Sequence, residues 1–127
     1  MIYMEWRFDN SRAIYIQLIE QIQRMIISGE YKPGDKLESV RELASVAKVN
    51  PNTMQRALSE LERVGLVHSE RTTGRFITED EELIDKMRKE MATQRVQEFI
   101  KYMVDIGFEK EEIKSFINEI LDQMKGE

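Results

Sequence analysis

Two helix-start signals follow each other closely in this sequence and limit the folds that it can adopt. Ser39 is followed three residues later by Glu42, the pattern of a capping box, which predicts a helix over residues 40–47. After a short turn come Asn50 and Pro51, residue types preferred at the N-cap and at the first position of a helix. The sequence therefore predicts two helices joined by a small turn.

A longer helix is predicted before this pair. Over residues 14–28, apolar side chains recur at intervals of three and four positions, as in an amphipathic helix, and Gly29 follows as its end. A Pro-Gly turn in residues 31–37 (YKPGDKL) connects this helix to the pair. Ahead of it, Trp6 and Phe8 predict a short strand or arm that ends in a turn.

A hairpin is predicted after the helix that starts at Asn50. That helix carries one apolar stripe and ends at Gly65, and residues 66–78 then read as a strand, a tight turn containing Gly74 and a second strand. This order of elements is the winged helix-turn-helix layout, whose second motif helix is placed in the DNA major groove. We therefore predict a mainly α fold with a small β-hairpin, in which residues 1–78 form a winged helix-turn-helix DNA-binding domain.

Charge is divided unevenly along the chain, whose formal net charge is −5. Residues 1–78 contain 11 Lys/Arg and 10 Asp/Glu, a net charge of +1, whereas residues 79–127 contain 8 and 14, a net charge of −6. The acidity therefore belongs to the C-terminal part. The N-terminal part can still present a locally basic face to nucleic acid.

Residue usage argues against an enzyme. The chain has no Cys and a single His, so a disulfide frame and a thiolate metal site are impossible, and His68 is interpreted as a strand surface residue. The sequence shows no phosphate-binding Gly loop and no nucleophile elbow. We expect no catalytic site, no cofactor and no metal. The opening residues lack the apolar region of a signal peptide and no apolar run approaches the length of a membrane span, which predicts a cytoplasmic protein without a membrane partner.

Residues 79–127 predict a helical hairpin. The apolar stripe of its first helix shifts near residues 93–94, which indicates a bend or a change of packing partner, and Gly107 with Phe108 indicates a helix stop. Two helices cannot bury both of their stripes in each other, so the surplus predicts a partner, and a two-fold homodimer is the commonest solution. We interpret this segment as a helical dimerisation tail and assign the contact to Phe99, Met103, Phe116, Ile117, Ile120 and Leu121.

Six separate pieces of the sequence, taken in order, resemble one known family. They are Tyr15-x-Gln17, Gly29-x-Tyr31-x-Pro33-Gly34-Asp35-x-Leu37, Ser39-Val40-Arg41-Glu42-Leu43-Ala44, Val49-Asn50-x-Asn52-Thr53, Leu61-Glu62-x-x-Gly65-Leu66 and Gly74-x-Phe76-Ile77. Together they resemble the DNA-binding domain of the GntR family of bacterial transcriptional regulators. The short helical remainder is similar to the YtrA subfamily, whose tail is a small dimerisation element.

The resemblance implies a set of DNA contacts. Arg41 would contact DNA from the start of the second helix, and the head of the third helix and the tip of the wing would do likewise. Carried over by position, these are Asn50, Asn52, Thr53, Gln55 and Gly74. Arg56 is added because it lies on the outward, polar face of the third helix. In the alternative interpretation Arg41 is a solvated residue on the helix surface or an ion-pair partner of Glu38 or Glu42, and the residues at the head of the third helix are only solvated polar side chains.

The sequence departs from the family at four positions. Glu38 stands where Pro is usual, which places a negative charge near the expected phosphate path. Thr72 and Arg75 replace the usual first Gly and the Thr of the wing, and Arg75 is predicted to add a phosphate or minor-groove contact. Gln55 replaces an Arg found in some relatives and favours adenine over guanine if it reads a base.

The resulting expectation is a homodimeric regulator, most often a repressor in this family, that binds double-stranded DNA. A symmetric pair reads an inverted repeat whose half-sites lie roughly one helical turn, about 10 bp, apart. The alternative is a winged-helix protein-interaction module without DNA binding. An unidentified small-molecule effector would bind at the dimer interface or between tail and winged helix, where Phe99, Tyr102 and Met103 would line a cleft or, alternatively, form the dimer core.

Overall fold

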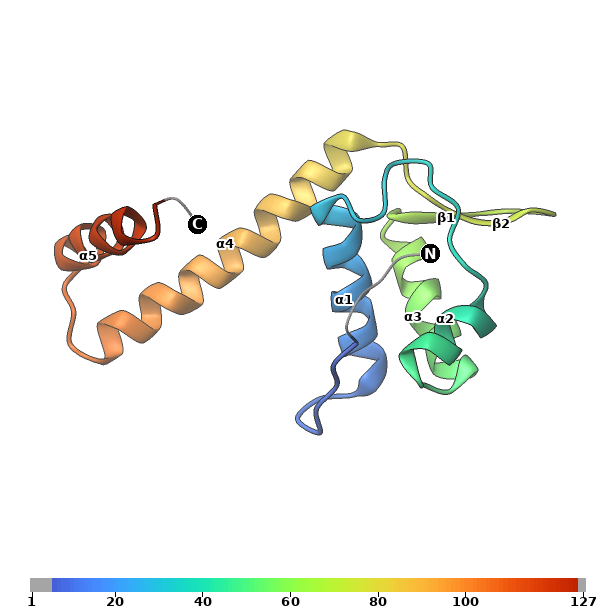
Figure 1. Cartoon of the computed structure of the whole chain (residues 1–127), viewed down its shortest axis with the longest axis horizontal. Coiled ribbons are helices and arrows are strands. Elements are labelled where there is room, and N and C mark those ends of the chain that lie inside the picture. The colour runs from blue at the N-terminus through green and yellow to red at the C-terminus, as the bar shows by residue number, and fades with distance from the viewer. Residues whose placement is uncertain (1–5, 126–127) are drawn as a thin grey trace. The chain divides into compact units, whose positions relative to one another are not determined.

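The structure, a computed structural model, describes residues 6–125, within which it contains five helices and one antiparallel hairpin (Figure 1). In chain order they are α1 (Ile14–Ser28), α2 (Val40–Ala47), α3 (Pro51–Arg63), β1 (Val67–Glu70), β2 (Gly74–Ile77), α4 (Glu81–Asp105) and α5 (Lys110–Gln123). The predicted fold class, mainly α with a small β-hairpin, is confirmed. Residues 1–5 of the predicted DNA-binding domain and residues 126–127 of the predicted tail lie outside the described residues.

The chain divides into two compact units within helix α4. The first unit ends at Met87 and the second begins at Arg88. α4 runs without interruption through residues 93–94, and it changes partners along its length, because Ile84 is buried in the core of the first unit whereas Met103 is buried in the second. Of the two predicted explanations for the shifted apolar stripe, the change of packing partner is the one observed.

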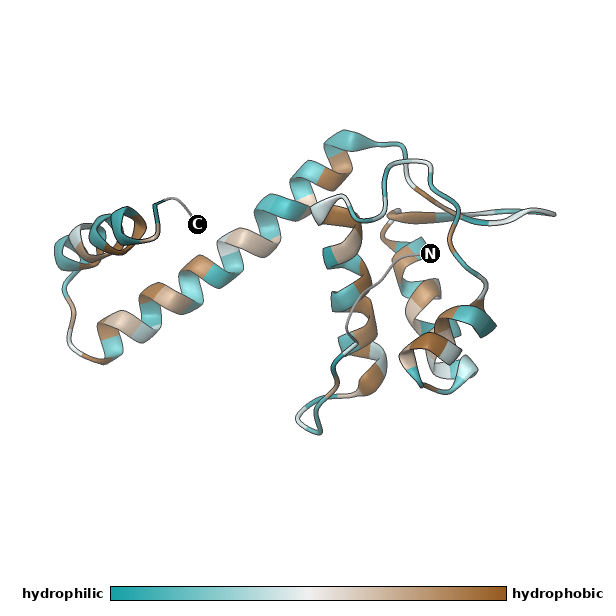
Figure 2. Ribbon diagram, viewed as in Figure 1, coloured by the Kyte–Doolittle hydropathy of each residue, from teal (hydrophilic) through white to brown (hydrophobic). Residues whose placement is uncertain are grey.

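The core of the first unit lies between α1, α2 and α3. α3 packs against both of the other helices, and Leu18, Ile22, Leu58 and Leu61 are at most 1% exposed. Figure 2 shows hydrophobic and hydrophilic residues alternating along α1 and α3, as expected for helices with one buried face. Burial of each such side chain contributes roughly 1.5–3 kcal/mol. α3, which carries half of the predicted DNA contacts, is therefore anchored in this core.

Hydrogen bonds at the starts of α2 and α3 fix the helix-turn-helix. Ser39 Oγ accepts from the Glu42 N–H at 3.1 Å, and Glu42 Oε1 accepts from the Ser39 N–H at 3.2 Å. At the next start, Asn50 Oδ1 accepts from the Asn52 N–H at 2.7 Å. Lys48, in the turn between them, has a left-handed backbone with φ of 59°. The predicted capping box and the predicted N-cap are both confirmed.

Two buried glutamines of α1 hold the segment that precedes it, residues 6–13. The Gln17 side chain accepts from the Asp9 N–H and donates to the Asp9 carbonyl, and the Gln21 side chain forms the same pair of bonds with Arg7. Gln17 is 4% and Gln21 7% exposed. The side-chain amide of each glutamine therefore bonds to both the N–H and the carbonyl of one backbone residue, as a neighbouring β-strand would. Of the predicted strand or arm, the described residues form an arm.

The wing is larger than the predicted hairpin. β1 and β2 pair in the predicted antiparallel manner. The segment before α2 also pairs with β2, because Lys36 forms a β-bridge with Phe76 and the Leu37 N–H donates to the Arg75 carbonyl at 2.9 Å. Gly74, with φ of 117°, starts β2 close to the Lys36 side chain. The wing is thereby joined to the segment that leads into α2.

The second unit is a helical hairpin, as predicted. Gly107, with φ of 105°, ends α4, and the Phe108 N–H donates to the Met103 carbonyl at 3.0 Å. Phe108 then stacks on Phe116 of α5, with ring centroids 5.6 Å apart. Met103 and Ile113 are each 4% exposed. Met103, Ile113 and the stacked rings of Phe108 and Phe116 form the small interior of this hairpin.

Candidate nucleic-acid interface

The head of α3 gathers four of the predicted contact residues in little more than one turn. Asn50, Asn52 and Gln55 are exposed and Thr53 is half-buried. The side-chain oxygen of Asn50 accepts the capping hydrogen bond from the Asn52 N–H. The side-chain N–H groups of Asn50 are therefore available to a partner outside the helix. These side chains stand beside the N–H groups at the positive end of the helix dipole. The site can therefore donate hydrogen bonds to phosphates and to base edges.

Two side chains on the outward face of α3, Gln55 and Arg56, have partners that orient them. Gln55 Nε2 donates to Ser59 Oγ at 3.3 Å. The Arg56 guanidinium lies over the ring of Tyr15 on α1, 3.6 Å from its centroid. A cation–π contact at an exposed site contributes about 0.5–1 kcal/mol. Arg56 is therefore held on the side of α3 that faces the start of α1.

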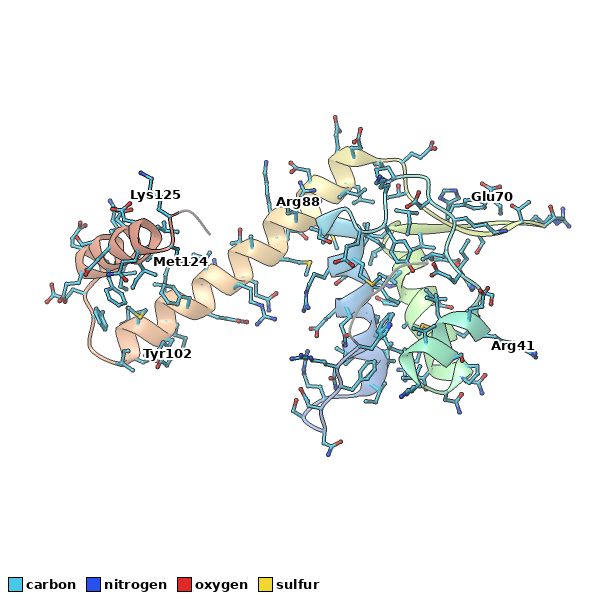
Figure 3. The ribbon with its side chains drawn as sticks, in the orientation of Figure 1. Arg41, Glu70, Arg88, Tyr102, Met124 and Lys125 are labelled. Carbon is cyan, nitrogen blue, oxygen red and sulfur yellow. The ribbon has the colours of Figure 1, made fainter. Side chains whose placement is uncertain are left out.

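Arg41 projects into solvent from the first turn of α2. Figure 3 shows its side chain pointing away from the first unit, on the side toward which the β1–β2 hairpin extends. Within residues 6–125 Arg41 forms no ion pair, so the alternative pairing with Glu38 or Glu42 is not observed. Glu38 instead accepts a hydrogen bond from the Tyr31 hydroxyl at 2.6 Å. The carboxylate of Glu38 is thus turned toward the side chain of Tyr31.

The Arg75 side chain does not lie where we expected it, at the tip of the wing in a position to contact DNA. Its side chain is 21% exposed and pairs with Glu62 of α3, which also accepts from Ser69 Oγ at 2.7 Å. Burial alone raises the pKa of Glu62, but these hydrogen bonds outweigh it and lower the pKa below its usual value. Gly74 is exposed at the start of β2. Arg75 therefore fastens the wing to α3, and its guanidinium does not stand at the tip.

Arg71 occupies the tip of the wing and was not among the predicted contacts. It is exposed in the turn between β1 and β2. Its place in the predicted tight turn was the signal that could have identified it. Arg41, Arg56 and Arg71 have no carboxylate partner among the described residues, whereas Arg63 pairs with Glu60. α2, α3 and the wing each contribute one arginine whose charge is not neutralised.

Most of the predicted dimerisation residues are exposed apolar side chains of the second unit. The exposed fraction is 41% for Phe99, 39% for Phe116, 37% for Ile120 and 58% for Leu121. Met103 differs, because it is buried inside the hairpin itself. Other large apolar side chains exposed on this unit are Val96, Tyr102, Val104, Ile106 and Met124. Figure 3 shows Tyr102 near the end of α4 and Met124 near the end of α5.

Comparison with known proteins identifies the family. A model described as "Bacterial regulatory proteins, gntR family" matches residues 14–77. The chain belongs to the GntR family. This GntR regulator is 43% identical over 110 residues to the HTH-type transcriptional regulator YhcF of Bacillus subtilis (strain 168), covering 87% of this chain and 91% of YhcF. It is 36% identical over 118 residues to the HTH-type transcriptional repressor YtrA of the same organism, covering 92% and 91% of the two chains.

Solved structures support the same assignment. A GntR family transcriptional regulator from Listeria monocytogenes aligns with a TM-score of 0.83 and 41% identity, covering 88% of this chain and 98% of that one. The DNA-binding domain of AraR, solved in complex with operator ORX1, aligns with a TM-score of 0.53 and 26% identity over 60% of this chain and 98% of its own. The predicted family and the winged helix-turn-helix are confirmed. The GntR chain is a DNA-binding transcriptional regulator. None of the helices within residues 6–125 combines the length and the apolar composition of a membrane-spanning segment.

Proposed function

We propose that this GntR regulator acts in the cytoplasm as a homodimer that binds an inverted-repeat operator and represses transcription. The observation that carries the proposal is the set of exposed polar and basic side chains on α2, α3 and the wing. Polar side chains at the head of α3 can read base edges, and Arg41, Arg56 and Arg71 can bind phosphates on either side. The operator complex of AraR gives an example in the same family. The name of YtrA supports repression.

The apolar surface of the second unit supports the homodimer. Single exposed apolar residues are normal, but this many large ones on a small helical hairpin support an interface. A closed two-fold pair would cover the same surface on both chains. It would also present two copies of α3 to successive major grooves, which is the geometry that an inverted repeat requires.

The alternative is a protein-interaction module without DNA binding. The negative charge of Glu38 was the feature that favoured it. In the structure this carboxylate is engaged by Tyr31, while Arg41, Arg56 and Arg71 have no carboxylate partner among residues 6–125. The distribution of charge therefore favours DNA.

Selection from a random duplex library by the purified protein tests the proposal. We expect an inverted repeat to be enriched, and we expect the enriched site, placed over a promoter, to lower transcription in vitro when the protein is added. Enrichment of no sequence would contradict operator binding. Enrichment of a single half-site would contradict the dimer, and increased transcription from every operator position would contradict repression.

A further inference from the structure

The first unit contains a cavity that the DNA-binding surface does not use. Its volume is about 270 Å³, slightly below the range of about 300–1,000 Å³ that is typical of pockets for drug-sized ligands. Trp6 and Tyr31 supply two aromatic walls, and Met25, Leu43 and Val46 supply apolar surface. A cavity of this size and lining fits a small organic molecule.

Two carboxylates give the cavity its charge. Glu38 and Glu42 both line it, and neither forms an ion pair with any residue between 6 and 125. Glu38 accepts from the Tyr31 hydroxyl and Glu42 accepts from the Ser39 N–H. Burial, followed by the hydrogen bond to Glu38, raises the pKa of Tyr31 well above its usual value, so the tyrosine stays the donor. The negative charge of both carboxylates remains available to a cation.

We infer that this cavity binds a small organic cation, namely an ammonium group on a compact apolar body. Aromatic faces and carboxylates are the combination that attracts such cations, because the ring quadrupole and the anionic oxygens both favour positive charge. Anions are repelled by the two glutamates. A bare Ca²⁺ or Mg²⁺ ion requires about six or more oxygen ligands, which the aromatic and apolar walls do not provide.

The position of the cavity connects it to the DNA-binding surface. Glu38 and Glu42 lie on either side of Arg41 in the sequence, and Glu42 is part of the capping box that starts α2. A cation that draws Glu42 into the cavity competes with the Ser39 N–H for its carboxylate. Binding would therefore shift the first turn of α2 and change DNA affinity, and DNA would change the affinity for the cation by the same factor. This second step rests on the proposed function; the binding step does not.

Trp6, the only tryptophan of the chain, makes the binding step directly measurable. Choline is titrated into the full-length protein without DNA, while the fluorescence of Trp6 is recorded and the heat of binding is measured by calorimetry. The matched control ligand is 3,3-dimethylbutan-1-ol, which has the shape of choline without its charge. We expect a saturable response to choline and at least about tenfold weaker binding of the neutral alcohol. Equal binding of both, or no saturable response in either measurement, would overturn the inference.

Variants localise the site. Glu38→Gln keeps the shape and an acceptor for Tyr31, and we expect it to weaken choline binding at least about fivefold. Glu90→Gln removes the same charge from an exposed position that does not line the cavity, and its affinity for choline should match that of the wild type. Equal losses of choline affinity in both variants would show a non-specific effect of charge and would overturn the assignment of the site to this cavity.

The coupling to DNA is tested separately. Operator affinity is measured with and without saturating choline, in the wild type and in Glu38→Gln. A change that occurs only in the wild type supports the coupling. If choline binds and operator affinity is unchanged, the site is supported and the coupling is overturned. A protein that binds choline but no DNA contradicts the proposed function alone.

Discussion

Arg75 of β2 forms an ion pair with Glu62 of α3, with Nε and Oε1 2.5 Å apart. The same carboxylate oxygen accepts a hydrogen bond from Ser69 of β1. Both strands of the wing are therefore tied to one side chain on the helix that carries the predicted base contacts. We interpret Arg75 as a positioning residue that sets the angle of the wing relative to α3.

The ion pair predicts a pH-dependent stability. The pKa of Glu62 is lowered in the folded state. The contribution of its ionised carboxylate to the free energy of unfolding is therefore fully present above the unfolded pKa near 4.5, and it is lost as pH falls through the lower folded pKa. We expect Glu62→Gln to lose about 0.5–1 kcal/mol of unfolding free energy at neutral pH. Urea unfolding of both proteins should show the difference shrinking below about pH 4.5. Glu30→Gln, at an exposed position, is the control, and a difference that is constant with pH would contradict the assignment.

Asn50 is predicted to combine a cap with a DNA contact, and two variants separate these roles. Asn50→Ala removes the acceptor for the Asn52 N–H and should lower the unfolding free energy by about 1 kcal/mol. Asn50→Asp keeps the acceptor and suits the helix dipole, so it should retain stability. It lacks the amide N–H groups and adds a negative charge, so it should weaken operator binding. Unchanged operator affinity of Asn50→Asp would restrict Asn50 to capping.

Arg41→Ala should weaken binding to all DNA sequences alike. A phosphate contact carries no sequence information, so its loss should reduce the slope of log affinity against log salt by about one unit. Anisotropy titrations at several salt concentrations measure both quantities. Arg24→Ala, on the exposed face of α1, is the matched control. A slope that falls equally in both variants would remove Arg41 from the interface.

Gln55→Ala should relax the preference for one base pair of the operator. If Gln55 reads adenine, the discrimination lost is about 1–3 kcal/mol at that position. Repeating the duplex selection with the variant shows which position becomes degenerate. Ser59→Ala removes only the internal partner of Gln55 and should keep the preference, and an unaltered selected site in Gln55→Ala would contradict the assigned role.

The double variant Phe116→Asp/Ile120→Asp should separate the dimer, because it places two charges on the exposed apolar surface of α5. Sedimentation should give the monomer mass, and binding to the inverted repeat should be lost. Ser115→Asp/Asn118→Asp adds the same charge at exposed polar positions of α5 and should remain dimeric. A Phe116→Asp/Ile120→Asp protein that still sediments as a dimer would show that the interface lies elsewhere.

Local signals in the sequence are sufficient to predict most of the helices and strands. The bounds predicted for α1 and α2, the capping box at Ser39 and the N-cap at Asn50 all agree with the structure. These features depend on residues within a few positions of one another, where capping chemistry and helical periodicity act directly. The head of α3 could be identified as the centre of the candidate site for the same reason.

The features that were not predicted depend on contacts between distant residues. Arg75 and Glu62 come together only when the wing folds onto α3, so the sequence pattern alone favoured a DNA contact for Arg75. Gln17 belongs to the family pattern, but its hydrogen bonds to the lead-in could not be inferred from a polar residue in an amphipathic helix. Met103 fits the apolar stripe of α4, and only the packing of the hairpin shows that it is buried.

The most direct test of the central proposal is an anisotropy titration of the wild-type protein on the selected inverted repeat, repeated with one half-site scrambled. Salt concentration is varied, and stoichiometry is determined by sedimentation of the complex. We expect two chains per duplex, a steep loss of affinity with salt and much weaker binding to the scrambled duplex. Equal affinity for both duplexes, or a complex that contains one chain, would contradict a dimeric operator-binding regulator.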